Sequence, residues 1–190
     1  GMFGRRARRL PSGGFLPTKD VPKPPALAAR GARVLTLTES ATFLDGMFFV
    51  SGEIPRVTPF EKGLPAHYQK SAAGQWEPDP WLRDERFLAV QVKDKGLVVF
   101  TACSHAGVIN VLSHARECFP AVPLYAVAGG LHLSGPNENI IADTVTALAQ
   151  FELAVIATGH CTGWRATVAL ASAFGDAALA PLAVGKRYSF

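Results

Sequence analysis

The chain has 190 residues, of which 48% are hydrophobic and 18% are charged, and its formal net charge is +4. This length fits one domain with a hydrophobic core, and the composition excludes a mainly disordered chain. No apolar run approaches the roughly 20 residues of a membrane span, so we expect no membrane partner. Three cysteines argue against a disulfide scaffold and fit a reducing compartment, so we expect a cytoplasmic protein.

The positive charge is concentrated near the N-terminus. The first 33 residues carry eight basic groups and one acidic group, whereas the rest of the chain carries 11 basic and 14 acidic groups. We therefore divide the chain into a basic, Pro- and Gly-rich arm over 1–32 and a body over 33–190. The cluster Arg5-Arg6-Arg8-Arg9 could contact RNA or a phosphorylated ligand. It has no interleaved aromatic residues, so we interpret it as a solvated arm and expect no nucleic-acid partner.

The first half of the chain predicts few regular elements. Prolines are spread through the arm and favour irregular structure, because proline disrupts helices and central strands. We expect strands at 33–38 and 47–51, followed by a long Pro-rich connection over 52–82. Two paired strands are predicted at 87–92 and 97–102, around the turn Lys93-Asp94-Lys95-Gly96.

From residue 97 onward the sequence repeats a strand, a loop and a helix three times. The strands are predicted at 97–102, 124–128 and 153–157, and each is followed by apolar residues at helical spacing. Asn137 is a good N-cap for the second helix, and a short final strand is predicted within 182–190. This order predicts an α/β fold in which helices cover a sheet.

One histidine follows each of these three strands: His105, His132 and His160. Because neighbouring strands lie about 5 Å apart, side chains at their carboxyl ends can converge on one point. Converging imidazoles predict a transition-metal site for Zn, Fe, Mn or Ni. The alternative is that each is an ordinary loop histidine bonded to the backbone. The other two histidines, His67 and His114, have no such placement, and we expect them to be solvated.

Polar and sulfur-containing residues flank these histidines. We place Cys103, Ser104, Cys161 and Thr162 around the metal ligands as supporting residues. Cys103 and Cys161 could also be soft metal ligands or plain buried cysteines. Cys103-Ser104-His105 could pair a nucleophile with a base, but no orienting group is evident. The turn from Gly129 to Asn137 resembles a phosphate-binding turn and is a weak signal, because it has no P-loop lysine.

The same residues carry a resemblance to a known family. The stretch from Phe100 to Asn110, with Cys103-Ser104-His105-Ala106-Gly107 at its centre, the stretch Gly129-Gly130-Leu131-His132-Leu133 and the stretch Gly159-His160-Cys161-Thr162-Gly163 are similar to the C-terminal half of a metallo-β-lactamase-superfamily hydrolase. The similar subgroup is that of 7,8-dihydropterin-6-methyl-4-(β-D-ribofuranosyl)aminobenzene-5′-phosphate synthase.

The resemblance implies a fold, a site and a chemistry. The fold would be one half of an αββα sandwich, a mixed sheet with helices on one face. His105 would match the third metal-binding motif and His160 the last, while His132 falls near a position where many members have a bridging Asp. The family site is dinuclear and often holds zinc, which activates water for attack on an ester, lactam or phosphoester. The implied substrate is a small ester or phosphoester.

The sequence departs from the family in one large respect. The strongest signature of the family, His-x-His-x-Asp-His, is absent together with everything that precedes it. We therefore expect a truncated protein that binds one metal through two or three histidines, with reduced or no activity. The sheet that normally packs on this half is also missing, so we expect an exposed apolar face covered by a homodimer. The alternative is a non-catalytic remnant that acts as a ligand-binding or protein-interaction module.

Overall fold

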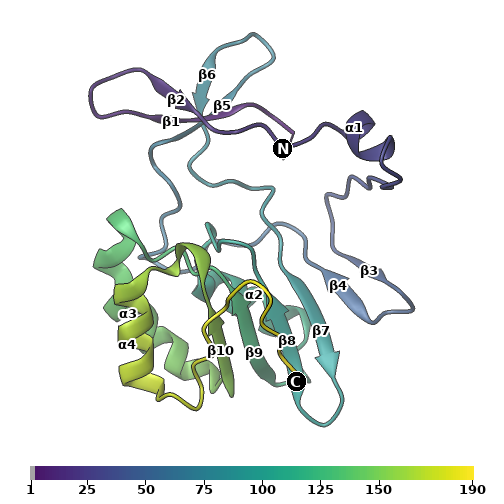
Figure 1. Cartoon of the computed structure of the whole chain (residues 1–190), viewed down its shortest axis with the longest axis vertical. Helices are drawn as coiled ribbons and strands as arrows, with labels where there is room; N and C mark the ends of the chain where they lie inside the picture. The colour runs from purple at the N-terminus through teal and green to yellow at the C-terminus, as the bar shows by residue number, and fades with distance from the viewer. Residues whose placement is uncertain (1–2) are drawn as a thin grey trace.

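A computed structural model gives the structure of residues 3–190; Gly1 and Met2, the first residues of the predicted arm, lie outside the described residues. The main sheet has six strands in the order β10-β9-β8-β7-β4-β3 (Figure 1). Strands β8, β9 and β10 run parallel, whereas β7, β4 and β3 are joined by antiparallel pairing. Their bounds are Ala41–Phe43 for β3, Phe48–Val50 for β4, Leu88–Val92 for β7, Gly96–Phe100 for β8, Leu124–Gly129 for β9 and Val155–Thr158 for β10.

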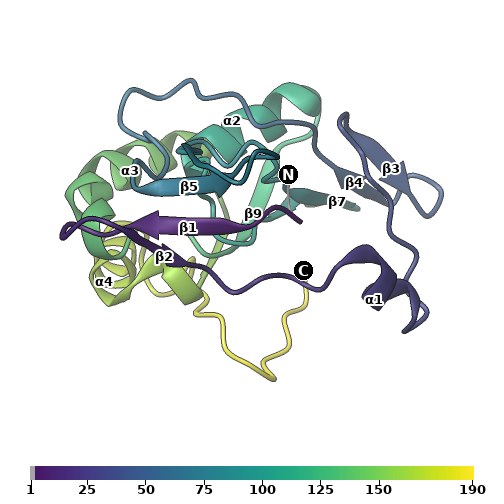
Figure 2. The same ribbon diagram turned by 90° about the horizontal axis from the view of Figure 1, so that it is seen from above.

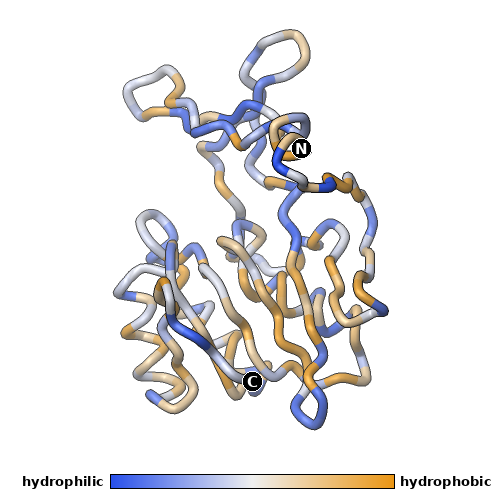
Figure 3. Tube along the Cα trace, turned by 45° about the vertical axis from the view of Figure 1, so that its right-hand side comes forward, coloured by the Kyte–Doolittle hydropathy of each residue, from blue (hydrophilic) through white to orange (hydrophobic). Residues whose placement is uncertain are grey.

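Each parallel strand leads through a loop into a helix, as predicted. The helices are α2 (Val108–Cys118), α3 (Ile141–Leu148) and α4 (Trp164–Phe174). Their buried leucines join one side of the sheet in a single core with Val99, Val127 and Ile156. The central strands are almost wholly apolar, as expected of strands with both faces covered, and Figure 3 shows hydrophobic residues concentrated along them. The predicted mixed α/β architecture, with helices on one face, is confirmed.

The opposite face of the main sheet is only partly covered by other parts of the chain. We call it the open face; its central row is Val50, Leu88, Phe100, Ala128 and Ala157, which lie side by side in the strand register. Figure 2 shows α2 on one side of the sheet and the C-terminal segment on the other. Phe190 contacts Phe100, with ring centroids 6.4 Å apart, and Ala157 is only 1% exposed. The predicted exposure of this face is therefore wrong around β8 to β10.

A second, four-stranded antiparallel sheet lies beyond one end of the main sheet (Figure 1). Its order is β2-β1-β5-β6, with bounds Arg6–Arg9 for β1, Phe15–Pro17 for β2, His67–Lys70 for β5 and Trp76–Pro78 for β6. Strand β1 is central and pairs with β5, and a short helix α1 (Pro24–Ala28) follows β2. The expectation of an irregular arm and a connection without strands is wrong. The prolines of the arm lie outside β1, which pairs both with the nearby β2 and with β5, about 60 residues away in the sequence.

Three further predictions about elements are wrong. Residues 33–38 form no strand, because none of the described strands pairs with them. Residues 182–190 are irregular too; one isolated bridge joins Leu179 to Ile156 instead. Asn137 does not cap the second helix but lies inside a 3-10 turn, Gly135–Ile140, that precedes α3. Among the described residues, no helix has the length and apolar character needed to cross a membrane.

Candidate metal centre

The three loops that follow β8, β9 and β10 meet at one edge of the main sheet. Each contains a non-glycine residue with a left-handed backbone: Ser104 (φ 55°), His132 (φ 48°) and His160 (φ 52°). Such conformations are unfavourable for these residue types and tend to cluster at functional sites. Two of these three residues are predicted ligands, and the third precedes the remaining ligand, His105.

Two buried hydroxyl groups hold these loops in register. The Ser104 hydroxyl donates to the carbonyl oxygen of Gly130 at 2.8 Å and so joins the first loop to the second. The Thr162 hydroxyl accepts a bond from the Leu131 N–H at 3.1 Å and donates to the Gly159 carbonyl at 2.8 Å. It thereby joins the third loop to the second. Ser104 and Thr162 are 2% and 1% exposed, so they support the histidines but do not face a substrate.

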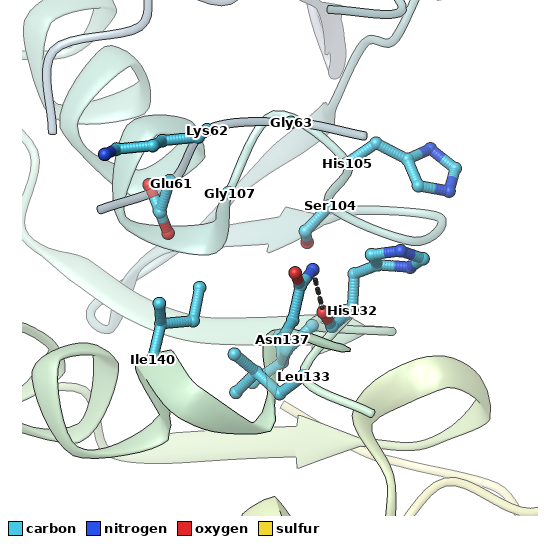
Figure 4. A pocket seen from close by; sticks show the side chains of 11 residues that line it. Glu61, Lys62, Gly63, Ser104, His105, Gly107, His132, Leu133, Asn137 and Ile140 are labelled. Carbon is cyan, nitrogen blue, oxygen red and sulfur yellow. Dashed lines mark hydrogen bonds between the residues drawn. The ribbon is translucent and has the colours of Figure 1, made fainter. Parts of the chain in front are cut away.

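The rings of His105 and His132 lie against each other. Their centroids are 4.7 Å apart in an edge-to-face arrangement, and both rings point toward the same side of the site in Figure 4. The Nδ1 atom of His105 lies 3.1 Å from a carboxylate oxygen of Glu85, whose side chain is 8% exposed. Glu85 also accepts the backbone N–H groups of His105 and Ala106. The carboxylate therefore orients the His105 ring and leaves its Nε2 atom available.

Glu85 keeps its negative charge in this place. Burial raises its pKa, but hydrogen bonds from the His105 side chain and from two backbone N–H groups outweigh burial, and the net shift is downward. A charged carboxylate behind an imidazole is the usual support of a metal-binding histidine. Sequence reasoning missed Glu85, because it sits in the charged run Arg83-Asp84-Glu85-Arg86, which is typical of a solvated loop.

His160 lies beside the two cysteines rather than between the other histidine rings. One ligand atom from each of Cys103, His160 and Cys161 lies within 4.8 Å of the others. The Sγ atom of Cys103 is 3.4 Å from Nδ1 of His160. His160 is exposed and both cysteines are half-buried, so the cluster is open to solvent on one side.

The two thiols are not equivalent. The hydrogen bond from Cys103 lowers the pKa of Cys161, burial opposes this, and hydrogen bonds from His132 and His160 lower it further, so the net shift is strongly downward. The same hydrogen bond to Cys161, together with burial, raises the pKa of Cys103. Cys103 is thus a poor nucleophile. The nucleophile-and-base alternative is further weakened because the Nδ1 atom of His105 faces Glu85.

The loop after β9 has its own supports. The Asn137 amide donates to the carbonyl oxygen of His132 at 2.9 Å, the dashed contact in Figure 4. A Cβ atom at Gly130 would lie 2.6 Å from Sγ of Cys161 and 3.0 Å from the carbonyl oxygen of Ala102. Only glycine therefore lets the first and third loops approach each other across the second.

Sequence reasoning also missed a second buried carboxylate. Glu61, which is 5% exposed, accepts the backbone N–H groups of Ile109 and Asn110 at 2.8 and 2.9 Å. It thus caps the N-terminus of α2 from the connecting segment, with no short sequence spacing to reveal it. Between Glu61 and the two histidine rings lies a cavity of about 20 Å³. That volume holds about one water molecule.

The other two histidines are not solvated as predicted. The side chains of His67 and His114 are only 11% and 19% exposed. The Nδ1 atom of His67 lies 3.2 Å from the Asp79 carbonyl oxygen, and the His114 ring packs edge-on against Phe87 at 5.9 Å. Both are packed into the structure, so neither belongs to the cluster at the strand ends.

The donor set at the strand ends suits a transition metal. Nδ1 of His132 is buried without a hydrogen-bond partner among the described residues. A buried ring nitrogen left without a partner is costly, and binding a cation there would satisfy it. Imidazole and thiolate ligands suit zinc and related ions better than Mg²⁺ or Ca²⁺. The residues present therefore fit a metal of the zinc type.

Comparison with known proteins gives two sequence relatives, while no protein-family model matches the chain. A segment of 85 residues is 36% identical to 7,8-dihydropterin-6-methyl-4-(β-D-ribofuranosyl)-aminobenzene-5′-phosphate synthase of Methanocaldococcus jannaschii, and it covers 45% of this chain and 29% of that protein. A second match, 29% identical over 136 residues, covers 72% of this chain and 48% of an uncharacterised protein of the same organism. The chain thus spans less than half the length of these curated relatives.

A solved structure shares the fold. The crystal structure of a metal-dependent hydrolase of the β-lactamase superfamily superimposes with a TM-score of 0.71 and 24% sequence identity. The match covers 83% of this chain and 58% of that one. The predicted resemblance is confirmed for the fold: the chain has the fold of the metallo-β-lactamase superfamily.

Proposed function

We propose that this chain is a metal-dependent, hydrolase-like protein of the metallo-β-lactamase superfamily, in which His105, His132 and His160 bind one transition metal. Zinc is the first choice, and Fe, Mn or Ni are the alternatives. The observation that carries the proposal is the meeting of three loops with left-handed backbone at the carboxyl ends of the parallel strands, where His105 and His132 lie ring against ring and His160 lies beside Cys103 and Cys161. The solved neighbour is a metal-dependent hydrolase, which supports the same reading.

The chemistry follows from the residues of this chain. A bound zinc ion supplies Lewis acidity and lowers the pKa of a water molecule. Glu85 orients the His105 ring, while Ser104 and Thr162 hold the three loops at fixed spacing. The adjoining cavity of about 20 Å³ has room for one water and none for an organic molecule, so a small ester or phosphoester would have to bind at the open side near His160.

We propose that hydrolysis by this chain is weak or absent. Its 190 residues contain no His-x-His-x-Asp-His sequence, so they lack the ligands and the acidic group which that motif supplies in the family. Three histidines can hold one metal and leave a position for water, which is the arrangement of many catalytic zinc sites.

Two further proposals concern the surroundings of the protein. The three cysteines are free thiols, which fits a cytoplasmic location. A homodimer would cover the open face beside β4, where a groove of about 600 Å³ is lined by Leu35, Leu37 and Val50, together with the charged Arg83, Asp84 and Arg86. Leu35 and Leu37 are 48% and 45% exposed, so a second copy of the chain would remove apolar surface from water there.

Metal analysis tests the proposed function. We expect about one equivalent of a transition metal in the chain purified without chelator, and clear loss of metal in His160→Ala. His114→Ala, on α2 and away from the strand ends, is the matched control and should keep the metal. Less than about a tenth of an equivalent in the unaltered chain, unchanged by His160→Ala, would refute the proposal and favour a non-catalytic ligand-binding or protein-interaction module.

A further inference from the structure

We propose that Cys103 and Cys161 join His160 in a soft-ligand metal site, in which two sulfur atoms and one imidazole nitrogen bind a thiophilic ion such as Zn²⁺ or Cu⁺. This inference rests on the proposed function, because His160 belongs to both sets of ligands. It adds two sulfur ligands, and these ligands determine the class of metal that binds.

The spacing of the three ligand atoms carries the inference. In a tetrahedral zinc site, bonds of about 2.3 Å to sulfur and 2.0 Å to nitrogen place those two atoms about 3.5 Å apart. The Sγ atom of Cys103 and the Nδ1 atom of His160 are 3.4 Å apart, so they already span one edge of such a tetrahedron. All three ligand atoms lie within 4.8 Å of one another. The remaining edges therefore exceed those of a tetrahedral site by no more than about 1 Å.

The fold brings these atoms together from strands that are not neighbours. Cys103 follows β8 and Cys161 follows β10, and β9 lies between them in the sheet. The two loops meet over Gly130, at the end of β9, because a Cβ atom there would lie 2.6 Å from Sγ of Cys161 and 3.4 Å from Cα of Cys103. Because glycine has no side chain, Gly130 leaves room for the two cysteines to approach each other.

The donor chemistry determines the class of metal. Sulfur ligands select zinc, Cu⁺ and similar soft ions and discriminate against Mg²⁺, Ca²⁺ and Mn²⁺, which prefer oxygen. Two cysteines and one histidine with an open fourth position make a set that is known from catalytic zinc sites. The exposure of His160 puts this fourth position within reach of solvent and of a small ligand. Cysteines bind a metal as thiolates, so any proton that they still carry is released to solvent when the metal binds.

Cobalt substitution tests the sulfur ligands directly. Co²⁺ is titrated into the reduced, metal-free chain, and the near-ultraviolet absorption is measured, because thiolate-to-cobalt charge transfer absorbs strongly there and imidazole ligation does not. We expect the band in the unaltered chain and in Cys118→Ser, whose thiol lies on α2. We expect its loss in Cys103→Ser and in Cys161→Ser. His105→Ala and His132→Ala should retain it.

Thiol protection gives a second measurement that needs no variant. A thiol reagent is added to the folded, reduced chain with and without Zn²⁺, and the number of reactive thiols is counted. We expect zinc to protect two of the three cysteines and to leave Cys118 as reactive as before.

The outcomes separate this inference from the proposed function. Cobalt bound without a charge-transfer band, together with three thiols that react equally with and without zinc, would overturn the sulfur ligands and leave the histidine site standing. No metal bound at all would overturn both. A charge-transfer band that persists in both cysteine variants would also overturn the inference.

Discussion

At the scale of single residues, the account depends on how each histidine is held. His105 is fixed by Glu85, and its loop is tied to the next by the Ser104 hydroxyl. The carbonyl oxygen of His132 accepts a hydrogen bond from the Asn137 amide, and its Nδ1 atom has no partner among the described residues. The sequence predicted the three histidines, because each follows a strand at a regular interval. It also placed Cys103 around the metal ligands, but it could not predict Glu85, because that residue lies in a charged run typical of a solvated loop.

Removing the charge behind His105 tests the role of Glu85. We expect Glu85→Gln to weaken zinc affinity by about 10- to 100-fold, the usual cost of losing a carboxylate that orients a histidine ligand. The measurement is the zinc dissociation constant by competition with a chelating dye. Glu53→Gln, at a side chain that is 55% exposed, is the control and should bind zinc normally. Equal affinities for the two variants would show that Glu85 has no part in the site.

Filling the space at Gly130 tests the close approach of the loops. We expect Gly130→Ala to lower the free energy of unfolding by about 1–3 kcal/mol, because its Cβ would overlap Sγ of Cys161. Gly52→Ala is the matched control, because its Cβ would lie no closer than 3.5 Å to a neighbouring atom. Denaturant unfolding of both variants gives the comparison. Equal stability of Gly130→Ala and Gly52→Ala would show that the loops do not need glycine at position 130.

At the scale of elements, the sequence predicted the strands and helices whose hydrophobic pattern lies within one segment. Strands β7 to β10 and the three helices were predicted because their alternation or helical spacing lies within each segment. Strands β1 and β5 were missed because their pairing, Ala7 with Tyr68, joins distant segments and because prolines are frequent in the sequence around both strands. Residues 33–38 alternate like a strand, yet they pair with none of the described strands.

One ion pair links the second sheet to the segment that leads into the main sheet. The Arg6 guanidinium of β1 donates to Asp84, which lies in the segment leading into β7 of the main sheet. Burial raises the pKa of Asp84, but the hydrogen bond and charge of Arg6 outweigh burial, and the net shift is downward from 3.8. Because the folded pKa is below the unfolded value, this contribution to stability is present above pH 3.8 and is lost as the pH falls through the folded pKa.

The variant Asp84→Asn isolates this contribution. We expect the unaltered chain to be the more stable of the two near neutral pH, and the difference in unfolding free energy to shrink as the pH falls below 3.8. Denaturant unfolding of both proteins at a series of pH values measures it. A difference that stays constant down to the acid limit would mean that the Arg6–Asp84 pair does not depend on the carboxylate charge.

At the scale of the whole molecule, the open face is the surface that the rest of the chain covers only in part. The C-terminal segment covers part of it with Phe190, and the remaining groove is lined by Leu35 and Leu37. We expect a homodimer by light scattering at high micromolar concentration, and a monomer for the double variant Leu35→Lys, Leu37→Lys. Val184→Lys, at a fully exposed position, should leave the dimer intact. A monomeric unaltered chain would contradict the proposal.

The central claim is that the loops after β8, β9 and β10 hold one metal through their histidines. Equilibrium dialysis against Zn²⁺ tests it most directly, with the triple variant of His105, His132 and His160 to Ala compared with the double variant His67→Gln, His114→Gln. The account predicts about one bound zinc per chain for the unaltered protein and the double variant, and close to none for the triple variant. Equal zinc binding by the triple variant and the unaltered chain would contradict it.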